Sequence, residues 1–316
     1  MVGERMKVLN QASGKNWVLY HGDSVEVLQG IPDNSIHYCI TSIPFASLYT
    51  YSNSDRDMGN SKTYEEFAEQ YQFLGREWYR CMMPGRNVSI HCMNLPTSKE
   101  KDGYIGIKDF RGDVIRWMQS LGFIYHSEVC IWKNPVTAMQ RTKALGLLHK
   151  QIKKDSCMSR QGIPDYLVTF RKPGDNPERV AHTNESYPVS KWQQVASPVW
   201  DEYATPVWWD INQSDTLNGK IAREDADERH ICPLQLPVIE RGIELWSNPG
   251  DIVLDPFNGI ASTGYKALIM GRKYVGVELK ESYYNVSIKN LQTAEDENQI
   301  NQSSLFEEDG DGCGIF

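Results

Sequence analysis

The 316-residue chain has no apolar run near the roughly 18 residues that a membrane-spanning helix needs. Residues 1–15 contain no apolar segment of the kind found in signal peptides. The seven cysteines are scattered and odd in number, and no two of them form a C-x-x-C pair. This pattern argues against a zinc site or a disulfide framework and is typical of a reducing cytoplasm. We therefore expect a cytoplasmic protein with no metal and no membrane partner.

The chain also lacks a net positive charge, which at first argues against a nucleic-acid partner. The net charge is −8, but the last 22 residues alone carry seven acidic residues and no basic ones. Residues 133–179, in contrast, hold ten Lys and Arg against four Asp and Glu. Local fields rather than whole-chain sums govern contact with phosphates. This basic segment is as compatible with a solvated face as with a nucleic-acid contact.

Apolar and polar residues alternate along the first 130 residues in the manner of a strand–helix–strand protein. Such alternation predicts an α/β fold with a doubly wound, mostly parallel sheet. The expected strands are 17–20, 36–40, 87–93 and 123–132, and the expected helices are 25–30, 64–83 and 113–120.

Periodicity is lost between residues 133 and 229, where prolines 164, 173, 177, 188, 198 and 206 interrupt the pattern and only 165–170 resembles a strand. We expect an irregular insertion here that lies outside the regular sheet. Order returns with helices at 233–246 and 262–270 and strands at 252–254 and 274–277. The acidic composition after Ala294 predicts a disordered tail. The expected division of the chain is 1–134, 135–229, 230–294 and 295–316.

The clearest chemical signal is the unit between Asp255 and Glu278. A strand ends at Asp255, a turn contains Gly259, a helix follows, and a second strand ends at Glu278, 19 residues beyond that glycine. Nucleotide-binding folds place the acid that holds ribose hydroxyls at this spacing. The loop is not G-x-G-x-x-G and so has no evident cradle for a pyrophosphate. S-adenosylmethionine suits it better than NAD, although a plain strand–turn–helix is the alternative.

A second signal is Thr41-Ser42-Ile43-Pro44-Phe45, directly after an apolar strand. Ligands of open sheets bind at the carboxyl ends of strands, so Ser42 is placed to touch a substrate. The exocyclic amine of a base is a poor nucleophile, and a catalyst must accept hydrogen bonds from its amino hydrogens. The Ser42 hydroxyl and the backbone carbonyl before Pro44 suit that task, and Phe45 suits stacking on a flipped base. Taken alone, this motif more often marks a plain strand exit with a buried phenylalanine.

Together the two motifs resemble the beta-class amino methyltransferases that act on DNA. His21-Gly22-Asp23-Ser24, residues 32–35 and residues 41–45 look like that family's catalytic half, and residues 255–263, 271–272 and 276–278 look like its cofactor half. His230-Ile231-Cys232-Pro233 stands where the family has a His-Pro entry to the adjoining helix. The resemblance covers about residues 17–134 and 228–291 and makes the intervening segment a target-recognition region.

The resemblance implies a Rossmann-like methyltransferase fold, S-adenosylmethionine as cofactor, and double-stranded DNA as partner. Its catalytic motif maps onto Ser42, Ile43, Pro44 and Phe45. Its cofactor-binding positions map onto Asp23, Ser24, Thr41, His230, Pro233, Asp255, Pro256, Phe257, Asn258, Gly259, Ala261, Ser262, Thr263 and Glu278. In this context we expect phosphate contacts from Lys143, Lys150, Lys153, Lys154 and Arg160, and a mobile lid at Tyr49 and Tyr51.

Two departures from the family pattern bear on activity. Ile43 replaces the first of two prolines, and Ala261-Ser262 stands where Gly-Thr is common. Serine with a terminal phenylalanine is, by resemblance, commoner in enzymes that methylate N4 of cytosine than in those that methylate N6 of adenine. The alternatives are methylation of RNA or of protein glutamine, and a catalytically silent DNA-binding relative. The sequence leaves open whether the protein is a homodimer and whether a cognate restriction nuclease accompanies it.

Overall fold

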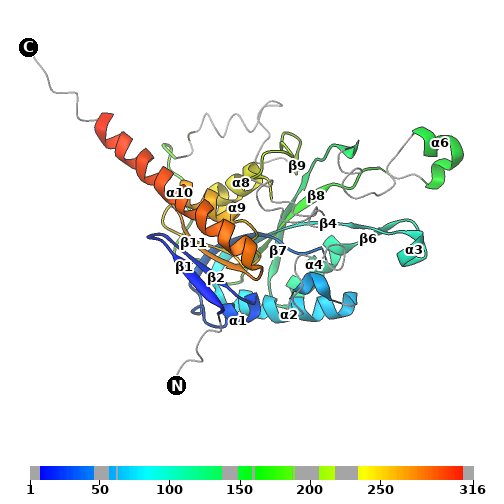
Figure 1. The fold of residues 1–316 in the computed structure, drawn as a ribbon, viewed down its shortest axis with the longest axis horizontal. Coiled ribbons are helices and arrows are strands. Elements are labelled where there is room, and N and C mark those ends of the chain that lie inside the picture. Colours follow the sequence, from blue (N-terminus) through cyan, green and yellow to red (C-terminus); the bar gives the residue numbers. More distant parts are fainter. Residues whose placement is uncertain are drawn as a thin grey trace, which may run out of the picture.

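A nine-stranded sheet forms the centre of the computed structural model, which describes residues 8–45, 57–61, 63–136, 149–158, 161–186, 188, 206–217 and 234–308. The strand order is β1-β2-β11-β10-β3-β4-β8-β7-β9 (Figure 1). Strands β1 and β8 run antiparallel to their neighbours and the other pairs are parallel, which confirms the predicted fold class. The strands are β1 (Asn10–Ser13), β2 (Trp17–His21), β3 (Ile36–Ser42), β4 (Met82–Met93), β7 (Ile124–Ile131), β8 (Asp165–Arg171), β9 (Val207–Trp208), β10 (Ile252–Asp255) and β11 (Lys273–Glu278).

Helices cover both faces of this sheet (Figure 1). One layer contains α1 (Ser24–Leu28), α2 (Tyr64–Cys81) and α4 (Phe110–Ser120), and the other contains α8 (Leu236–Trp246), α9 (Ser262–Ile269) and α10 (Glu281–Glu308). The remaining elements are the hairpin β5 (Leu95–Pro96) and β6 (Ile107–Lys108), the short helices α3 (Lys99–Asp102) and α6 (His149–Asp155), and the 3-10 turns η2 (Met58–Asn60) and η3 (Ser156–Met158). Within the described ranges, no helix has the length and apolar character to cross a membrane.

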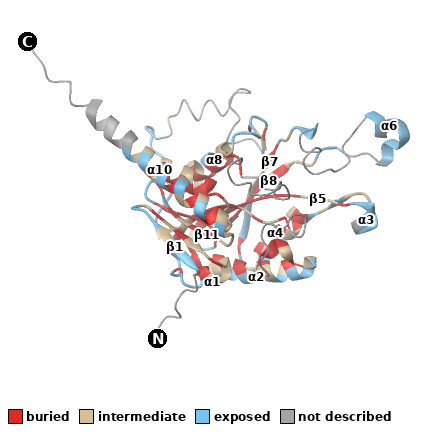
Figure 2. Ribbon diagram, in the orientation of Figure 1, coloured by how far each residue is buried: buried red, intermediate tan, exposed pale blue. Residues whose placement is uncertain are grey.

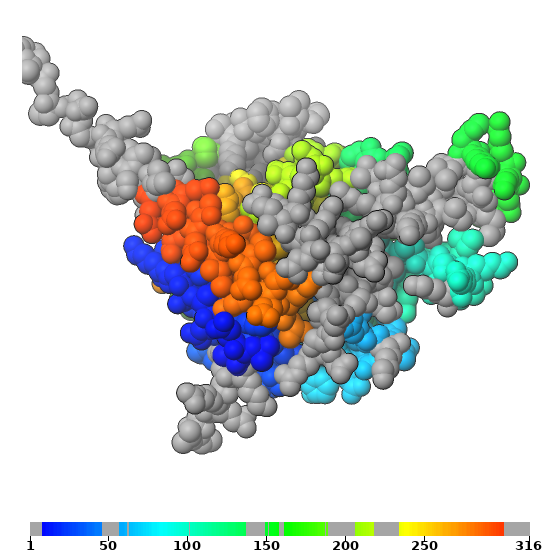
Figure 3. Space-filling view, viewed as in Figure 1, coloured from blue at the N-terminus to red at the C-terminus, as the bar shows by residue number. Residues whose placement is uncertain are grey.

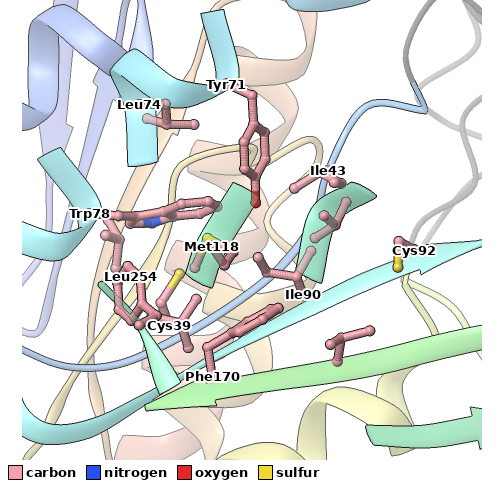
Figure 4. Packing of buried hydrophobic residues seen from close by; sticks show 14 of the residues in the cluster. Cys39, Ile43, Tyr71, Leu74, Trp78, Ile90, Cys92, Met118, Phe170 and Leu254 are labelled. Carbon is pink, nitrogen blue, oxygen red and sulfur yellow. The ribbon is translucent and has the colours of Figure 1, made fainter. Parts of the chain in front are cut away.

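The core is apolar on both faces of the sheet, and the buried residues lie between the helix layers (Figure 2). Helix α2 begins at its cap Thr63 and buries Phe67, Tyr71, Leu74 and Trp78, the face that its periodicity predicts. These side chains pack on residues of β3, β4 and β10 (Figure 4). This packing holds in place strands β3 and β10, whose carboxyl ends carry the motifs at Ser42 and Asp255.

The expectation that 135–229 lies outside the sheet is wrong for two strands. Strand β8 is paired on both sides, with β4 and with β7, and β9 extends the sheet beyond β7. Strands β7 and β8 are therefore part of the central sheet, because β8 pairs with both β4 and β7. Helix α6, between β7 and β8, projects away from the body of the protein (Figure 1).

The expectation of disorder after Ala294 is wrong for residues 295–308, which continue helix α10. The Glu295 carboxylate accepts from the backbone N–H groups of Lys15 and Asn16, the latter at 2.8 Å. Glu297 accepts from the Tyr265 hydroxyl at 2.6 Å, and Asn298 donates to the Leu268 carbonyl at 2.5 Å. In Figure 3 the surface of α10 lies against that of the N-terminal strands. Hydrogen-bond donors from other parts of the chain thus hold the first acidic residues after Ala294 in place.

These contacts predict different effects for two truncations of the tail. Removal of residues 295–316 should lower Tm by a few degrees, because several hydrogen bonds of about 1 kcal/mol each are lost. Removal of residues 300–316 should leave Tm nearly unchanged, since Glu295, Glu297 and Asn298 remain. Thermal unfolding followed by circular dichroism measures both. Equal Tm values for the two truncations would contradict this assignment.

Candidate active site

The candidate site lies at the carboxyl ends of five neighbouring parallel strands. The register places His21 of β2 beside Glu278 of β11, and Ser42 of β3 beside His91 of β4. Strand β10, which ends at Asp255, lies between β11 and β3. From β3 the chain continues outward to β4 on one side of the sheet, whereas from β10 it continues outward to β11 on the other side. The direction of winding therefore changes between β3 and β10. Open α/β sheets bind ligands at such a switch point.

Ser42 is the first member of a chain of polar contacts. Its Oγ lies 2.9 Å from Nδ1 of His91, and Nε2 of His91 lies 3.1 Å from Oδ2 of Asp165. The same carboxylate oxygen is paired with the ammonium group of Lys133. Burial alone would raise the pKa of Asp165, but the positive charge of Lys133 and the contact with His91 lower it below its usual value. The site thus contains a buried carboxylate that is held ionised.

The rest of the catalytic motif is largely apolar and packed. Ile43 is 1% exposed and belongs to the core (Figure 4). The Phe45 ring is 7% exposed and makes edge contacts with His91 and Phe110, with ring centroids 6.1 and 6.5 Å apart. Pro44 follows Ile43, so the Ile43 carbonyl precedes a proline as the sequence requires. Ser42 is therefore the side chain of this motif that offers a polar group.

Asp255 joins the two halves of the site. Its Oδ1 accepts from the Thr41 hydroxyl at 2.6 Å and from the backbone N–H of Phe257 at 3.0 Å. Burial raises the pKa of Asp255 to about 6, although these hydrogen bonds and one from Thr263 oppose the shift. Because Thr41 precedes Ser42, this contact fixes the catalytic strand end against the cofactor loop. Asp255, which is 4% exposed, therefore connects the end of β3 to the loop after β10.

The loop after β10 has the backbone geometry of a ligand cradle. Gly259 has φ +55°, and a Cβ added there would meet no atom within 4 Å, so space lies in front of this backbone. Asn258 is used internally, since it donates to Ser287 and accepts from the Tyr274 hydroxyl. Ala261 also has positive φ, +68°, at the start of α9, and the Oγ of Ser262 is buried with no hydrogen bond to the described residues.

Glu278 anchors the opposite side of this loop. Its carboxylate accepts from the backbone N–H groups of Gly259 at 2.7 Å and Lys280 at 2.8 Å. Burial, together with the nearby charges of Asp57 and Asp255, raises the pKa of Glu278 to about 8. Asp57 is 8% exposed, and its Oδ2 is buried without a hydrogen bond to any residue that the structure describes. A buried carboxylate oxygen of this kind fits a ligand that carries N–H or O–H donors.

Asp57 was not predicted as a site residue, because it belongs to no recognisable sequence motif. Its one local signal is the pattern Asp-x-Gly, in which the carboxylate caps η2 by accepting from Gly59 N–H at 2.8 Å. His91, Asp165 and Lys133 were missed as site residues for a different reason. The register of β3, β4 and β8 brings His91 and Asp165 to Ser42, and the pairing of β7 with β8 brings Lys133 to Asp165.

The N-terminal motif contributes mainly to local structure. Asp23 caps α1 by accepting from Val25 and Glu26 N–H, and the Ser24 hydroxyl donates to the Pro256 carbonyl. This last bond connects α1 to the cofactor loop. The other predicted positions divide in two. Lys150, Lys153 and Lys154 are exposed on α6. Outside the described residues lie His230, Pro233, Lys143, Arg160, Tyr49 and Tyr51.

Comparison with known proteins assigns this constellation to a family. The model of the N6/N4 methyltransferase family, described as DNA methylase, matches residues 36–289. The chain belongs to the N6/N4 DNA methylases. The type II methyltransferase M.ScaI of Streptomyces caespitosus is 37% identical over 91% of this chain and 87% of its own length. M.BglII of Bacillus subtilis is 24% identical over 89% of this chain and 70% of its own length.

Solved structures agree on the fold of this N6/N4 DNA methylase. The PvuII DNA methyltransferase, which is cytosine-N4-specific, has a TM-score of 0.62 at 18% identity and covers 93% of this chain and 95% of its own. TTHA0409 of Thermus thermophilus, in complex with S-adenosyl-L-methionine, has a TM-score of 0.62 at 23% identity and covers 87% and 93%. The predicted family and Rossmann-like architecture are confirmed.

Proposed function

We propose that this S-adenosylmethionine-dependent DNA methyltransferase methylates the 4-amino group of a cytosine that is turned out of the duplex. The observation that carries the proposal is the position of the Ser42 hydroxyl. It lies at the end of β3, next to the β10 strand end that begins the cofactor loop. A base amine brought to Ser42 thus meets a hydrogen-bond acceptor beside the place where a methyl donor would lie.

The residues around the open space at Gly259 fit S-adenosylmethionine. Glu278 is placed to accept from ribose hydroxyls, and the free Oδ2 of Asp57 is a second acceptor for the donor groups of the ligand. Phe257, which packs edge-on against Trp78 at the loop, adds an aromatic surface suited to a nucleoside. When bound, S-adenosylmethionine supplies an electrophilic methyl group on a positively charged sulfur.

The task of the protein is to position and polarise the amine. The nitrogen lone pair forms the new N–C bond as the S–C bond breaks and leaves its electron pair on sulfur, and the nitrogen then loses one proton. Ser42 Oγ and the Ile43 carbonyl accept the two amino hydrogens and so favour tetrahedral geometry at nitrogen. A base within a duplex cannot reach this strand end, and the reaction therefore requires base flipping.

Two observations favour cytosine over adenine. The acceptor is the Ser42 hydroxyl rather than a carboxylate, and the motif ends in Phe45, the combination that the family resemblance associates with cytosine.

Nucleoside mass spectrometry tests the proposal. DNA methylated by the purified enzyme with S-adenosylmethionine should yield N4-methylcytosine, and parallel reactions with RNA and with a glutamine-containing peptide should yield no methylated product. A reaction without cofactor is the background control. N6-methyladenine as the sole product would overturn the choice of base while leaving the DNA methyltransferase activity in place. Methylated RNA or peptide would overturn the choice of DNA.

The exposed lysines of α6 lead to a prediction about DNA affinity. If Lys150, Lys153 and Lys154 contact phosphates, their replacement by glutamine should weaken binding similarly for all sequences. It should also reduce the slope of log K against log salt by about one unit for each lysine. Lys273 is exposed at the amino end of β11 and is a matched control, since Lys273→Gln should leave the slope unchanged. Fluorescence anisotropy at several salt concentrations measures the slopes, and unaltered slopes in the α6 variants would place DNA recognition elsewhere.

A further inference from the structure

We propose that His91, Asp165 and Lys133 form a proton relay behind Ser42, in which His91 receives the proton that Ser42 passes on from the target amine. The inference rests on the proposed function, because it needs an amine substrate at Ser42. It adds a positioning residue and a proton acceptor on strands that lie outside the methyltransferase motifs.

The geometry sets the direction of the relay. The Asp165 carboxylate lies 3.1 Å from His91 Nε2, an ion-pair distance, although neither Nε2 nor Oδ2 makes a hydrogen bond within the described residues. We infer from this proximity that Nε2 carries the proton. Nδ1 is then an acceptor, and the Ser42 hydroxyl donates to it across 2.9 Å. The Ser42 proton consequently points into the protein. Both lone pairs of Ser42 Oγ are left for the amino hydrogen of the base.

The proton balance follows from this orientation. When the methylated nitrogen releases one proton to Ser42 Oγ, the original Ser42 proton moves to His91 Nδ1. His91 becomes an imidazolium, and Ser42 ends with the hydroxyl that it began with. The Asp165 carboxylate stabilises the new charge, while Lys133 keeps that carboxylate ionised beforehand. Exchange of the imidazolium proton with solvent resets the relay.

A structural role alone accounts poorly for this arrangement. Asp165 is 1% exposed and His91 is 5% exposed, and burial of such groups costs more than burial of apolar side chains of similar volume. One backbone carbonyl would suffice to hold the Ser42 hydroxyl. The chain instead keeps four polar groups in a line that ends at the proposed reaction centre.

Several other charged groups on the packed elements are paired elsewhere or lie at the far end of their strands. They are Arg111 with Glu128, Arg116 with Asp113, Arg241 with Asp210, Lys266 with Glu240, and Arg86 and His37 with Asp251. Arg171 lies at the opposite end of β8 from Asp165. Asp255, Asp57 and Glu278 are further titratable groups at this end of the sheet, so variants of His91 and its protonation by NMR, rather than a pH profile, test the relay.

Single-turnover kinetics at saturating DNA and cofactor tests the relay. His91→Asn keeps an acceptor near the Nδ1 position but cannot take up a proton. It should lower the rate about a hundredfold, whereas it should keep the rate if His91 served only to hold the Ser42 hydroxyl. His126→Asn is the matched control: His126 is an exposed β7 histidine whose Nδ1 also contacts a serine, Ser127 at 2.9 Å. It should behave as wild type.

A second readout needs neither activity nor cofactor. Nitrogen-15 NMR of labelled histidines in the free protein should show the His91 proton on Nε2 rather than on Nδ1. The Nδ1–H tautomer would overturn the proposal, because the hydrogen bond to Ser42 would then run the other way.

One kinetic outcome would also overturn the relay, namely a His91→Asn variant that methylates at the wild-type rate. If His91→Asn fails to fold, the tautomer that NMR finds in the wild-type protein still decides. Methylation of adenine instead of cytosine would refute only the proposed base, since the same variants report on the relay with either amine.

Discussion

Replacement of Ser42 by alanine should lower the rate of methyl transfer roughly a hundred- to a thousandfold, the usual cost of one lost transition-state hydrogen bond. The variant loses the acceptor for the amino hydrogen and, with it, access to His91, whose Nδ1 lies 2.9 Å from Ser42 Oγ. The affinity for S-adenosylmethionine should change little, since Thr41 and Asp255 keep their contact. Single-turnover kinetics and calorimetry on the same preparation separate the two effects.

Ser89→Ala is the matched control for this substitution. The Ser89 hydroxyl is buried on β4 and bonded to Thr169 at 2.9 Å, so its loss has a similar cost in stability without touching the site. Full activity in Ser42→Ala would place the chemistry elsewhere. A trapped covalent enzyme–DNA adduct would do the same. The nearest thiol in sequence is Cys39, a core residue whose pKa is raised well above its usual value by burial, and it is therefore a poor nucleophile.

The predictable part of the fold is the part with strong local periodicity. Helix α2 and strands β3, β10 and β11 lie close to their expected bounds, because their apolar spacing matches one buried face or a fully buried strand. The place of β8 in the sheet was not predictable. Residues 165–170 resemble a strand, but their pairing with β4 depends on contacts across about 75 residues of sequence. The local sequence pattern carries no information about which distant strands pair with each other.

The same limit applies to the site. The two motif halves were found because each is contiguous, and the comparisons confirm the family that they indicate. Asp57, His91 and Asp165 belong to no contiguous motif. The burial of neighbouring residues can also differ in a way that composition does not predict: Trp208 is completely buried, whereas Trp209 is 67% exposed. Strand geometry directs successive side chains to opposite faces.

Glu278 should make nucleoside binding strongly dependent on pH. Its carboxyl has a pKa of about 8 in the free protein, so it is mostly protonated at pH 6 and ionised at pH 9. Ribose hydroxyls donate better to a carboxylate than to a carboxylic acid. If only the ionised form binds, affinity should rise about a hundredfold between pH 6 and pH 9. Calorimetry with 5′-methylthioadenosine, which lacks the titrating amino group of methionine, isolates this effect.

Stability should follow the opposite course in the free protein. A carboxyl whose pKa is higher in the folded state than in the unfolded state holds more protons when folded. The free energy of unfolding should therefore fall as pH rises from the unfolded value, about 4.3, toward 8. Glu278→Gln should flatten both the stability curve and the binding curve across this range, because an amide does not titrate.

Asp57→Asn provides the sharper test of this electrostatic argument. The charge of Asp57 is one of the causes that raise the pKa of Glu278, so its removal should move the midpoint of the binding curve to lower pH. The variant should also bind 5′-methylthioadenosine more weakly at pH 9 if the free Oδ2 of Asp57 accepts from the ligand. An unmoved midpoint would separate Asp57 from Glu278. A pH-independent affinity in the wild type would remove Glu278 from the ribose site altogether.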